Sequence, residues 1–327
     1  MCTHPNFGIR VLDKLTGAIT VKFIGSYDKY HGKYNFSFDK VGSGLGDFVL
    51  LPCGQCMECR IKKAREWSIR LLHEKQLHEK SCFLTLTYND EHLPVNNSLC
   101  VEDVQKFLKN YRHELERKQD GRKIRYFCAG EYGSKSFRPH YHLIIFGDDF
   151  TKDRYCFGVS HGNKYYRSDT LERLWPYGYS VIGSVTNDSV MYVARYVTKK
   201  ITGSISAFYY DGVKPEFSTM SRRPGIAHDW LLKHSQDIYN YDKCYFKGLE
   251  LRPPAYYDRL FSVLHPEEFC LIKDKRSEMM VANKEDLIKK IYSSGNVKNF
   301  DELESYFAGK AEIANKKISK VKGYEKL

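Results

Sequence analysis

The sequence lacks a run of about 18 apolar residues, so it predicts no membrane-spanning helix. Its first residues, MCTHPNFGIRVLDKL, lack the apolar segment of a secretory signal peptide. Without such a signal, the ten cysteines among 327 residues are expected to be free thiols or metal ligands rather than a disulfide framework. We therefore expect a protein of a reducing cytoplasm.

Acidic residues are in the minority, with 40 Asp and Glu against 52 Lys and Arg and a net charge of +12. This balance favours a polyanionic partner, nucleic acid before a membrane surface, although a basic soluble protein with no such partner has the same charge. The 25 tyrosines suit base stacking beside Lys and Arg, but rings that only pack the core or surface are the alternative.

The periodicity of apolar residues predicts an α+β fold, with an antiparallel sheet covered by helices on one face. No internal repeat and no regular strand–helix–strand alternation is present. We expect helices at 56–80, 98–118, 169–177 and 187–202, and strands at 81–90, 123–133, 140–147 and 179–185. The apolar stripes of the two long helices are Ile61, Ala64, Ser68, Leu71 and Leu72 in the first, and Val101, Val104, Phe107, Leu108 and Tyr111 in the second.

Two histidines stand one residue apart in FRPHYHLIIFG, residues 137–147. Because residues i and i+2 of a strand point to the same face, His140 and His142 are expected to project side by side. Tyr141, Leu143 and Ile145 would then share the other face. Two imidazoles at this spacing can bind one divalent ion, although two histidines with ordinary hydrogen bonds have the same pattern.

Glu131 ends the preceding predicted strand, nine residues before His140. In a hairpin of the two strands, this carboxylate would lie at the histidine end of its partner and complete a two-His, one-carboxylate set. Iron oxygenases use such a set as well, whereas phosphate-ester chemistry favours Mg²⁺ or Mn²⁺. The alternative for Glu131 is a surface carboxylate at a strand end.

Tyr192 and Tyr196 lie four residues apart on a predicted helix, so they share one face. Asn187 or Asp188 is expected to cap this helix. A tyrosine hydroxyl can attack a phosphodiester and form a covalent phosphotyrosine, with a cation such as Lys199 or Lys200 stabilising the phosphate charge. The alternative is two aromatic core residues on an amphipathic helix.

Cys53, Cys56 and Cys59 form C-x2-C-x2-C directly before the first predicted helix. This spacing is a candidate half of a structural zinc site, and reduced cysteines without a metal are an equally weighted alternative. A fourth ligand would come from elsewhere in the sequence. The candidates are Cys2, His4, His73 and Cys82.

Three of these motifs occur in the order found in the HUH endonucleases, which are rolling-circle replication initiators and relaxases. FLTLTYND resembles the first strand motif of that family, RPHYHLIIFG its metal motif, and YVARYVTKK the paired-tyrosine motif. Within the family, the chain resembles initiators of the Microviridae, small single-stranded DNA phages. The stretches PCGQCMECRIKKAREWSIRL, GEYGSKSFRPHYHLIIFG and MSRRPGIAHDW are similar to the gokushovirus branch.

The resemblance implies a three-part chain: an N-terminal strand and loop arm at 1–52, an HUH endonuclease domain at 53–204, and a mainly helical region of unknown role at 205–327. It implies that Tyr192 and Tyr196 are nucleophiles, that His140 and His142 bind Mg²⁺ or Mn²⁺, and that Glu131 is the third ligand. Lys199 or Lys200 is expected to orient phosphate.

The implied activity is site-specific nicking of one strand of the double-stranded replicative form, followed by joining of the displaced single strand. Host helicase and polymerase in the bacterial cytoplasm would be partners, and no membrane is involved. Two rival functions stay open at this point. One is a non-catalytic, zinc-containing nucleic-acid-binding protein, and the other is a hydrolytic nuclease that uses water as the nucleophile.

Overall fold

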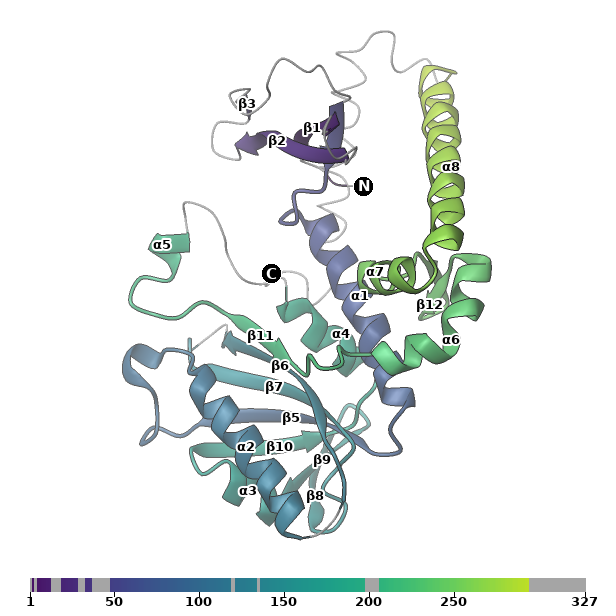
Figure 1. Cartoon of the computed structure of the whole chain (residues 1–327). Coiled ribbons are helices and arrows are strands. Elements are labelled where there is room, and N and C mark those ends of the chain that lie inside the picture. The colour runs from purple at the N-terminus through teal and green to yellow at the C-terminus, as the bar shows by residue number, and fades with distance from the viewer. Residues whose placement is uncertain are drawn as a thin grey trace. The chain divides into compact units, whose positions relative to one another are not determined.

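The chain divides into two compact units, each described here by itself (Figure 1). One unit is Met1–Lys62 with Asn283–Leu327, and the other is Lys63–Ala282. The predicted boundaries at residues 52 and 204 stay predictions. The computed structural model describes residues 2, 5–12, 19–28, 33–36, 48–118, 121–133, 136–197 and 206–293.

The first unit contains a four-stranded antiparallel sheet with the strand order β3-β2-β1-β4. Antiparallel pairing of β1 with β4 places Asn6 opposite Leu51, so the two ends of this 46-residue stretch meet. In the part of the sheet whose side chains are described, the buried apolar side chains are Ile9 and Ile24, which make a small core. The strands are β1 (Asn6–Leu12), β2 (Ile19–Asp28), β3 (Lys33–Phe36) and β4 (Phe48–Leu51).

The second unit is built on a seven-stranded antiparallel sheet with the order β11-β6-β7-β5-β10-β9-β8. This sheet confirms the predicted α+β class. The sequence interpretation found four of its strands and missed β8, β9 and β11, which lie at the two edges. The strands are β5 (Ser81–Tyr88), β6 (Arg125–Tyr132), β7 (Pro139–Phe146), β8 (Arg154–Ser160), β9 (Asn163–Ser168), β10 (Gly178–Gly183) and β11 (Phe217–Met220).

Helices cover both faces of this sheet, whereas the sequence predicted helices on one face only. The central strand β7 is apolar on both sides, with Leu143 in the cluster under α2 and Ile144 in the cluster under α1 and α4. A strand buried on both faces requires two helical layers. The covering helices are α2 (Val101–Arg117) and α3 (Asp169–Leu174) on one face, and α1 (Met57–Gln76), α4 (Asn187–Tyr196), α6 (His228–Tyr241) and α7 (Ala255–Leu264) on the other.

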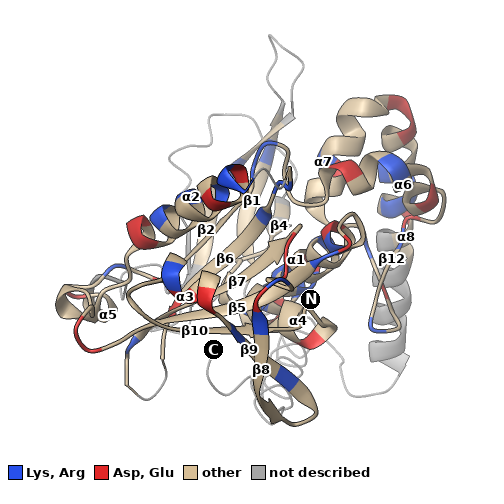
Figure 2. Cartoon of the chain, turned by 90° about the horizontal axis from the view of Figure 1, so that it is seen from below, with Lys and Arg blue, Asp and Glu red and all other residues tan. Residues whose placement is uncertain are grey.

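The predicted stripe of α2 is confirmed at Val104, Phe107, Leu108 and Tyr111, all of which are buried against the sheet. Its outer surface carries both acidic and basic side chains (Figure 2). The smaller elements are η1 (Val95–Asn97), α5 (Ser206–Tyr209), β12 (Cys244–Phe246), β13 (Leu249–Leu251) and α8 (Pro266–Ser293). None of the helices in the described part of the chain is long and apolar enough to span a membrane.

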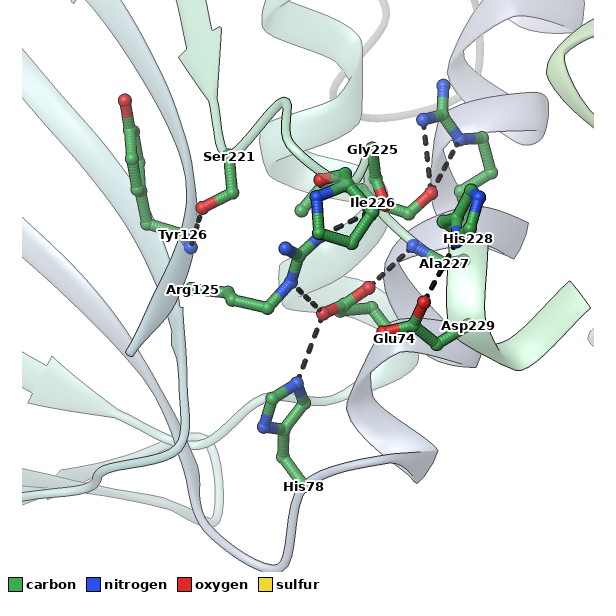
Figure 3. A network of polar contacts seen from close by, with 12 residues as sticks. Glu74, His78, Arg125, Tyr126, Ser221, Gly225, Ile226, Ala227, His228 and Asp229 are labelled. Atoms are coloured by element: carbon green, nitrogen blue, oxygen red, sulfur yellow. Dashed lines mark hydrogen bonds and ion pairs between the residues drawn. The ribbon is translucent and has the colours of Figure 1, made fainter. Parts of the chain in front are cut away.

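A buried carboxylate, Glu74, ties α1 to the sheet and to the segment before α6 (Figure 3). Its Oε1 accepts from Arg125 Nε at 2.5 Å and from His78 Nε2 at 3.1 Å, and its Oε2 accepts from the Ala227 N–H at 2.5 Å. Burial raises the pKa of Glu74, but His78, the Ala227 N–H and Arg125 together outweigh burial and lower it. The sequence pattern predicted an apolar stripe for α1 and gave no sign of this charge within it.

Candidate active site

The two histidines lie on the face of β7 that α4 covers (Figure 1). On this face β7 contributes Ile144 and Phe146 to the apolar cluster shared with α1 and α4. The alternate residues Tyr141, Leu143 and Ile145 belong to the opposite cluster, under α2. The predicted alternation of His140 and His142 with the apolar residues is confirmed.

The predicted hairpin of β6 and β7 is also confirmed, with Glu131 directly opposite His140. Glu131 lies diagonally across from His142, and its Oε1 is 2.9 Å from His142 Nε2. The other ring nitrogen of His142, Nδ1, is 3.2 Å from the Thr85 hydroxyl on β5. Glu131 and His142 are each 6% exposed, so this polar contact is buried.

His140 has a different environment on the same face. Its Nδ1 is 2.6 Å from the carbonyl oxygen of Arg138, which fixes the proton on Nδ1 and leaves Nε2 with the free lone pair. Burial lowers the pKa of His140, against the Arg138 carbonyl, which raises it. The His140 and His142 rings are nearly parallel, at 14°, with centroids 6.5 Å apart.

Two of the three predicted metal ligands lie at the spacing of a coordination sphere. Two ligands at right angles on an ion about 2.1 Å away are about 3.0 Å apart, which the contact of His142 with Glu131 matches. His140 does not converge with them: among the described residues, only four cysteines form a group of three or more His, Cys, Asp or Glu whose ligand atoms all lie within 4.8 Å. The donor types and this contact fit a divalent ion, and a turn of the His140 side chain is needed to complete the set.

The tyrosine helix α4 begins at a capping box. The Ser189 N–H donates to Thr186 Oγ1 at 3.1 Å, and the Thr186 N–H donates to Ser189 Oγ at 2.8 Å. The predicted cap at Asn187 or Asp188 is therefore wrong by one or two residues, because Thr186 and Ser189 satisfy each other's backbone donors.

Both tyrosines reach the histidine face of the sheet. The Tyr196 ring stacks on His142 at 5.4 Å and 13°, and the Tyr192 ring meets His142 edge-on at 5.1 Å and 81°. The two tyrosine rings are 4.9 Å apart and almost perpendicular. Tyr192 is 41% exposed and Tyr196 is 7% exposed, so solvent reaches one ring far more than the other.

Glu131 also hydrogen-bonds both tyrosines, so one carboxylate joins the histidine and the two phenols. Burial raises the pKa of Tyr192 and of Tyr196, and the negative charge of Glu131 raises both further. Each phenol is therefore held in its protonated form, with a carboxylate next to its hydroxyl.

Strand β5 contributes two residues that the sequence interpretation did not single out. Thr85 binds His142, and the Phe83 ring lies 5.7 Å from His142 and 6.4 Å from Tyr192. The alternation in FLTLTYND was the available signal, because Leu84 and Leu86 face the other apolar cluster. Lys199 and Lys200 lie outside the described residues.

The candidate zinc ligands lie in the N-terminal unit, apart from this site in the sequence. Cys53, Cys56 and Cys59 are joined by Cys2, with all four sulfur atoms within 4.8 Å of one another. Of the other candidates for a fourth ligand, His73 hydrogen-bonds the Tyr257 hydroxyl at 2.9 Å and Cys82 is buried in the large sheet. His4 lies outside the described residues.

Comparison with known proteins places this geometry in a family. A family model for replication-associated protein ORF2 and similar proteins matches residues 81–201. The chain is 32% identical over 269 residues to Replication-associated protein VP4 of Bdellovibrio phage phiMH2K, covering 78% of this chain and 83% of that protein. The chain belongs to the family of phage replication-associated proteins.

Two further members of the family support this assignment. Replication-associated protein ORF2 of Spiroplasma virus 4 is 35% identical over 244 residues, covering 70% of this chain and 73% of that protein. Replication-associated protein ORF4 of Chlamydia phage 1 is 29% identical over 255 residues, covering 76% and 60%. No solved structure matches the chain. The predicted resemblance to phage replication initiators is thereby confirmed, and the chain acts in phage DNA replication.

The matched region of this replication-associated protein runs from the first residue of β5 to just past α4. It therefore contains β6, β7 and every described residue of the histidine–tyrosine site. The N-terminal sheet and the cysteine cluster lie outside the match.

Proposed function

We propose that this replication-associated protein is a metal-dependent DNA nickase and strand transferase that starts and ends rolling-circle replication of a phage genome. The observation that carries the proposal is the packing of two tyrosines and one carboxylate around His142, on a sheet face shared with His140. A core of inert aromatics would not need a buried carboxylate bonded to a histidine and to both phenols.

The proposed reaction is a transesterification. A tyrosine hydroxyl oxygen bonds to the phosphorus of one phosphodiester, the bond from phosphorus to the 3′ oxygen breaks, and the DNA strand ends in a free 3′-OH. The phenol proton goes to a base, and the leaving 3′ oxygen takes up a proton. Glu131, which hydrogen-bonds both hydroxyls, is placed to accept that phenol proton.

A Mg²⁺ or Mn²⁺ ion bound by His142, Glu131 and His140 would supply Lewis-acid polarisation of the phosphoryl oxygen. The chain itself contributes the orientation of these donors. Thr85 and the Arg138 carbonyl each hold one histidine ring by its Nδ1, as outer partners of metal-binding histidines do. Lys199 or Lys200 would add a cation near the phosphate.

The two tyrosines have different access to DNA, which supports an order of use. Tyr192 is 41% exposed and takes the first phosphate, whereas Tyr196, at 7%, attacks after the first strand has been displaced. In this scheme the 3′-OH left by the first step primes synthesis by the host polymerase, a host helicase separates the strands, and the second step closes the circle. The reaction takes place in the bacterial cytoplasm.

The decisive experiment is covalent trapping on DNA. Single-stranded oligonucleotides that tile the genome are labelled at the 3′ end, because the fragment retained on tyrosine carries the new 5′ end. With Mn²⁺, the labelled fragment should shift to the size of the protein on a denaturing SDS gel. The Tyr192→Phe, Tyr196→Phe double variant should lose the shift, and Tyr241→Phe, which removes an exposed hydroxyl on α6, should retain it.

The same gel separates the rival functions. Cleavage without a shifted band would indicate a hydrolytic nuclease that uses water, and DNA binding without cleavage would indicate a non-catalytic binding protein. A shifted band that persists in the double variant would show that another residue is the nucleophile.

A further inference from the structure

Four cysteines from two distant parts of the sequence meet beside the N-terminal sheet. Cys2 precedes β1 and Cys53 follows β4, and the antiparallel pairing of these strands brings the two residues together. The Cys53 N–H donates to Cys2 Sγ at 3.3 Å, across 51 residues of sequence. Cys56 and Cys59 complete the group, at the start and in the first turn of α1.

The sulfur positions match a mononuclear metal site. A tetrahedral zinc ion with Zn–S bonds of about 2.3 Å places its sulfur atoms about 3.8 Å apart. Cys56 Sγ lies 3.7 Å from Cys2 Sγ, and all four sulfur atoms lie within 4.8 Å of one another. None of the four is in a disulfide. The space between them suits one ion and is too small for a cluster of several iron and sulfide ions.

The backbone around the cysteines donates hydrogen bonds to the sulfur atoms, as thiolate ligands require. The Cys56 N–H donates to Cys53 Sγ at 3.2 Å, and the Gly54 N–H donates to Cys59 Sγ. Gly54 adopts φ +73°, which bends the chain so that its N–H faces the cluster. The positive end of the α1 dipole lies at the same place and favours negative charge there.

The N-terminal sheet has little else to hold it. Its described side chains bury two apolar residues, Ile9 and Ile24, and Val21 and Phe23 of β2 are about half exposed, at 46% and 50%. A segment of this size with so small a core is normally stabilised by a metal, a disulfide or a partner. The four thiols lie where the first and last strands of the sheet meet, which is where a metal would close it.

We propose that Cys2, Cys53, Cys56 and Cys59 bind one structural Zn²⁺ ion that fastens the N-terminal sheet to the first turn of α1. Each thiol gives its proton to solvent as its sulfur binds the ion, and no redox step is involved. Thiolate ligands in a tetrahedral set select zinc among the common divalent ions. This site is independent of the histidine–tyrosine site and of the nicking reaction.

The first test is metal content. The full chain is expressed without a tag, because oligohistidine binds zinc, and is analysed by inductively coupled plasma mass spectrometry after gel filtration. We expect about one zinc per chain. Replacement by Co²⁺ should give the intense visible bands and the sulfur-to-metal charge-transfer absorption of a tetrathiolate site. Absence of metal, or iron in place of zinc, would overturn the proposal.

The second test concerns Cys2 itself. Cys2→Ser should weaken Co²⁺ and Zn²⁺ binding by more than the roughly 10- to 100-fold that loss of an outer partner causes. It should also make the segment before α1 sensitive to protease. Cys270→Ser, a matched change at an exposed cysteine outside the cluster, should leave both properties unchanged. Unchanged metal affinity in Cys2→Ser would exclude Cys2 as a ligand, and the Co²⁺ spectrum of the unaltered chain decides the ligand set if that variant does not fold.

Discussion

The Tyr196 ring lies flat against His142, with ring centroids 5.4 Å apart and the planes inclined by 13°. This stacking brings a helix residue and a strand residue, 54 positions apart in the sequence, to the same carboxylate, Glu131. It also gives Tyr196 a much more buried position than Tyr192. The difference between two tyrosines one helical turn apart leads to the first prediction.

Tyr192 should form the first covalent link to DNA. In a single-turnover reaction on a 3′-labelled single strand, Tyr192→Phe should slow attachment at least about tenfold, equivalent to about 1.4 kcal/mol of activation free energy. Tyr196→Phe should leave this first step nearly unchanged and impair joining of a second strand. Equal rates for the two variants would show that exposure does not set the order.

Thr85 should position His142 for metal binding. Thr85→Val removes the hydroxyl that meets His142 Nδ1, and it should raise the Mn²⁺ concentration for half-maximal nicking by about 10- to 100-fold. Saturating Mn²⁺ should restore most of the rate. Thr85→Ser retains the hydroxyl and is the matched control. A loss of rate that Mn²⁺ does not rescue would argue against a positioning role.

Glu74→Gln should destabilise the fold without touching the site. The change keeps the shape but leaves the largely buried Arg125 without its carboxylate, so the free energy of unfolding at pH 7 should fall by about 3 kcal/mol. Urea denaturation measures this loss, and Glu79→Gln, at a position just beyond α1, is the control.

The Glu74 effect should depend on pH. Its pKa is lowered in the folded state, so the carboxylate stabilises the fold above its unfolded pKa of about 4.3 and loses this contribution as pH falls through the folded value. The stability difference between the original chain and Glu74→Gln should therefore shrink below about pH 4. A difference that stays constant from pH 7 to pH 3.5 would contradict the assignment.

His73 should make the fold sensitive to mild acid. It stacks on Trp230, with centroids 3.5 Å apart, and burial, reinforced by His234, lowers the pKa of His73 to about 4. The folded state binds fewer protons than the unfolded state, so stability is complete above about pH 6.5 and falls as pH drops towards 4, by about 3 kcal/mol.

The control for this prediction is His73→Phe, which keeps a ring against Trp230 and cannot titrate. It loses the hydrogen bond to the Tyr257 hydroxyl, so its stability at pH 7 should be lower. Its decline between pH 6.5 and pH 4 should be shallower than that of the original chain. Parallel declines would assign the acid sensitivity to other groups.

Local sequence patterns predicted the parts of the site whose geometry is repetitive. The alternation around His140 and His142 fixed the face that each side chain takes, because strand residues alternate. The spacing of Tyr192 and Tyr196 placed both phenols on one side of α4. Glu131 needed one more step, a hairpin between neighbouring strands, and that pairing is present.

Contacts between distant segments could not be predicted in the same way. Thr85 reaches His142 only because β5 pairs with β7, and nothing in FLTLTYND specifies that neighbour. Glu74 lies on a helix predicted to bury an apolar stripe, and its partners come from residues 78, 125 and 227. The cap of α4 moved to Thr186 because Ser189 supplied the reciprocal hydrogen bond.

The sequence by itself determined the class of fold, the phage replication family and the side chains that face one another across short distances, because helix and strand periods are local properties of the chain. The tertiary structure alone decided that helices cover both sheet faces, that Tyr196 stacks on His142, and that Cys2 joins the other three cysteines. These outcomes depend on which distant strands and helices pack together, and that choice is made by burial summed over the whole core.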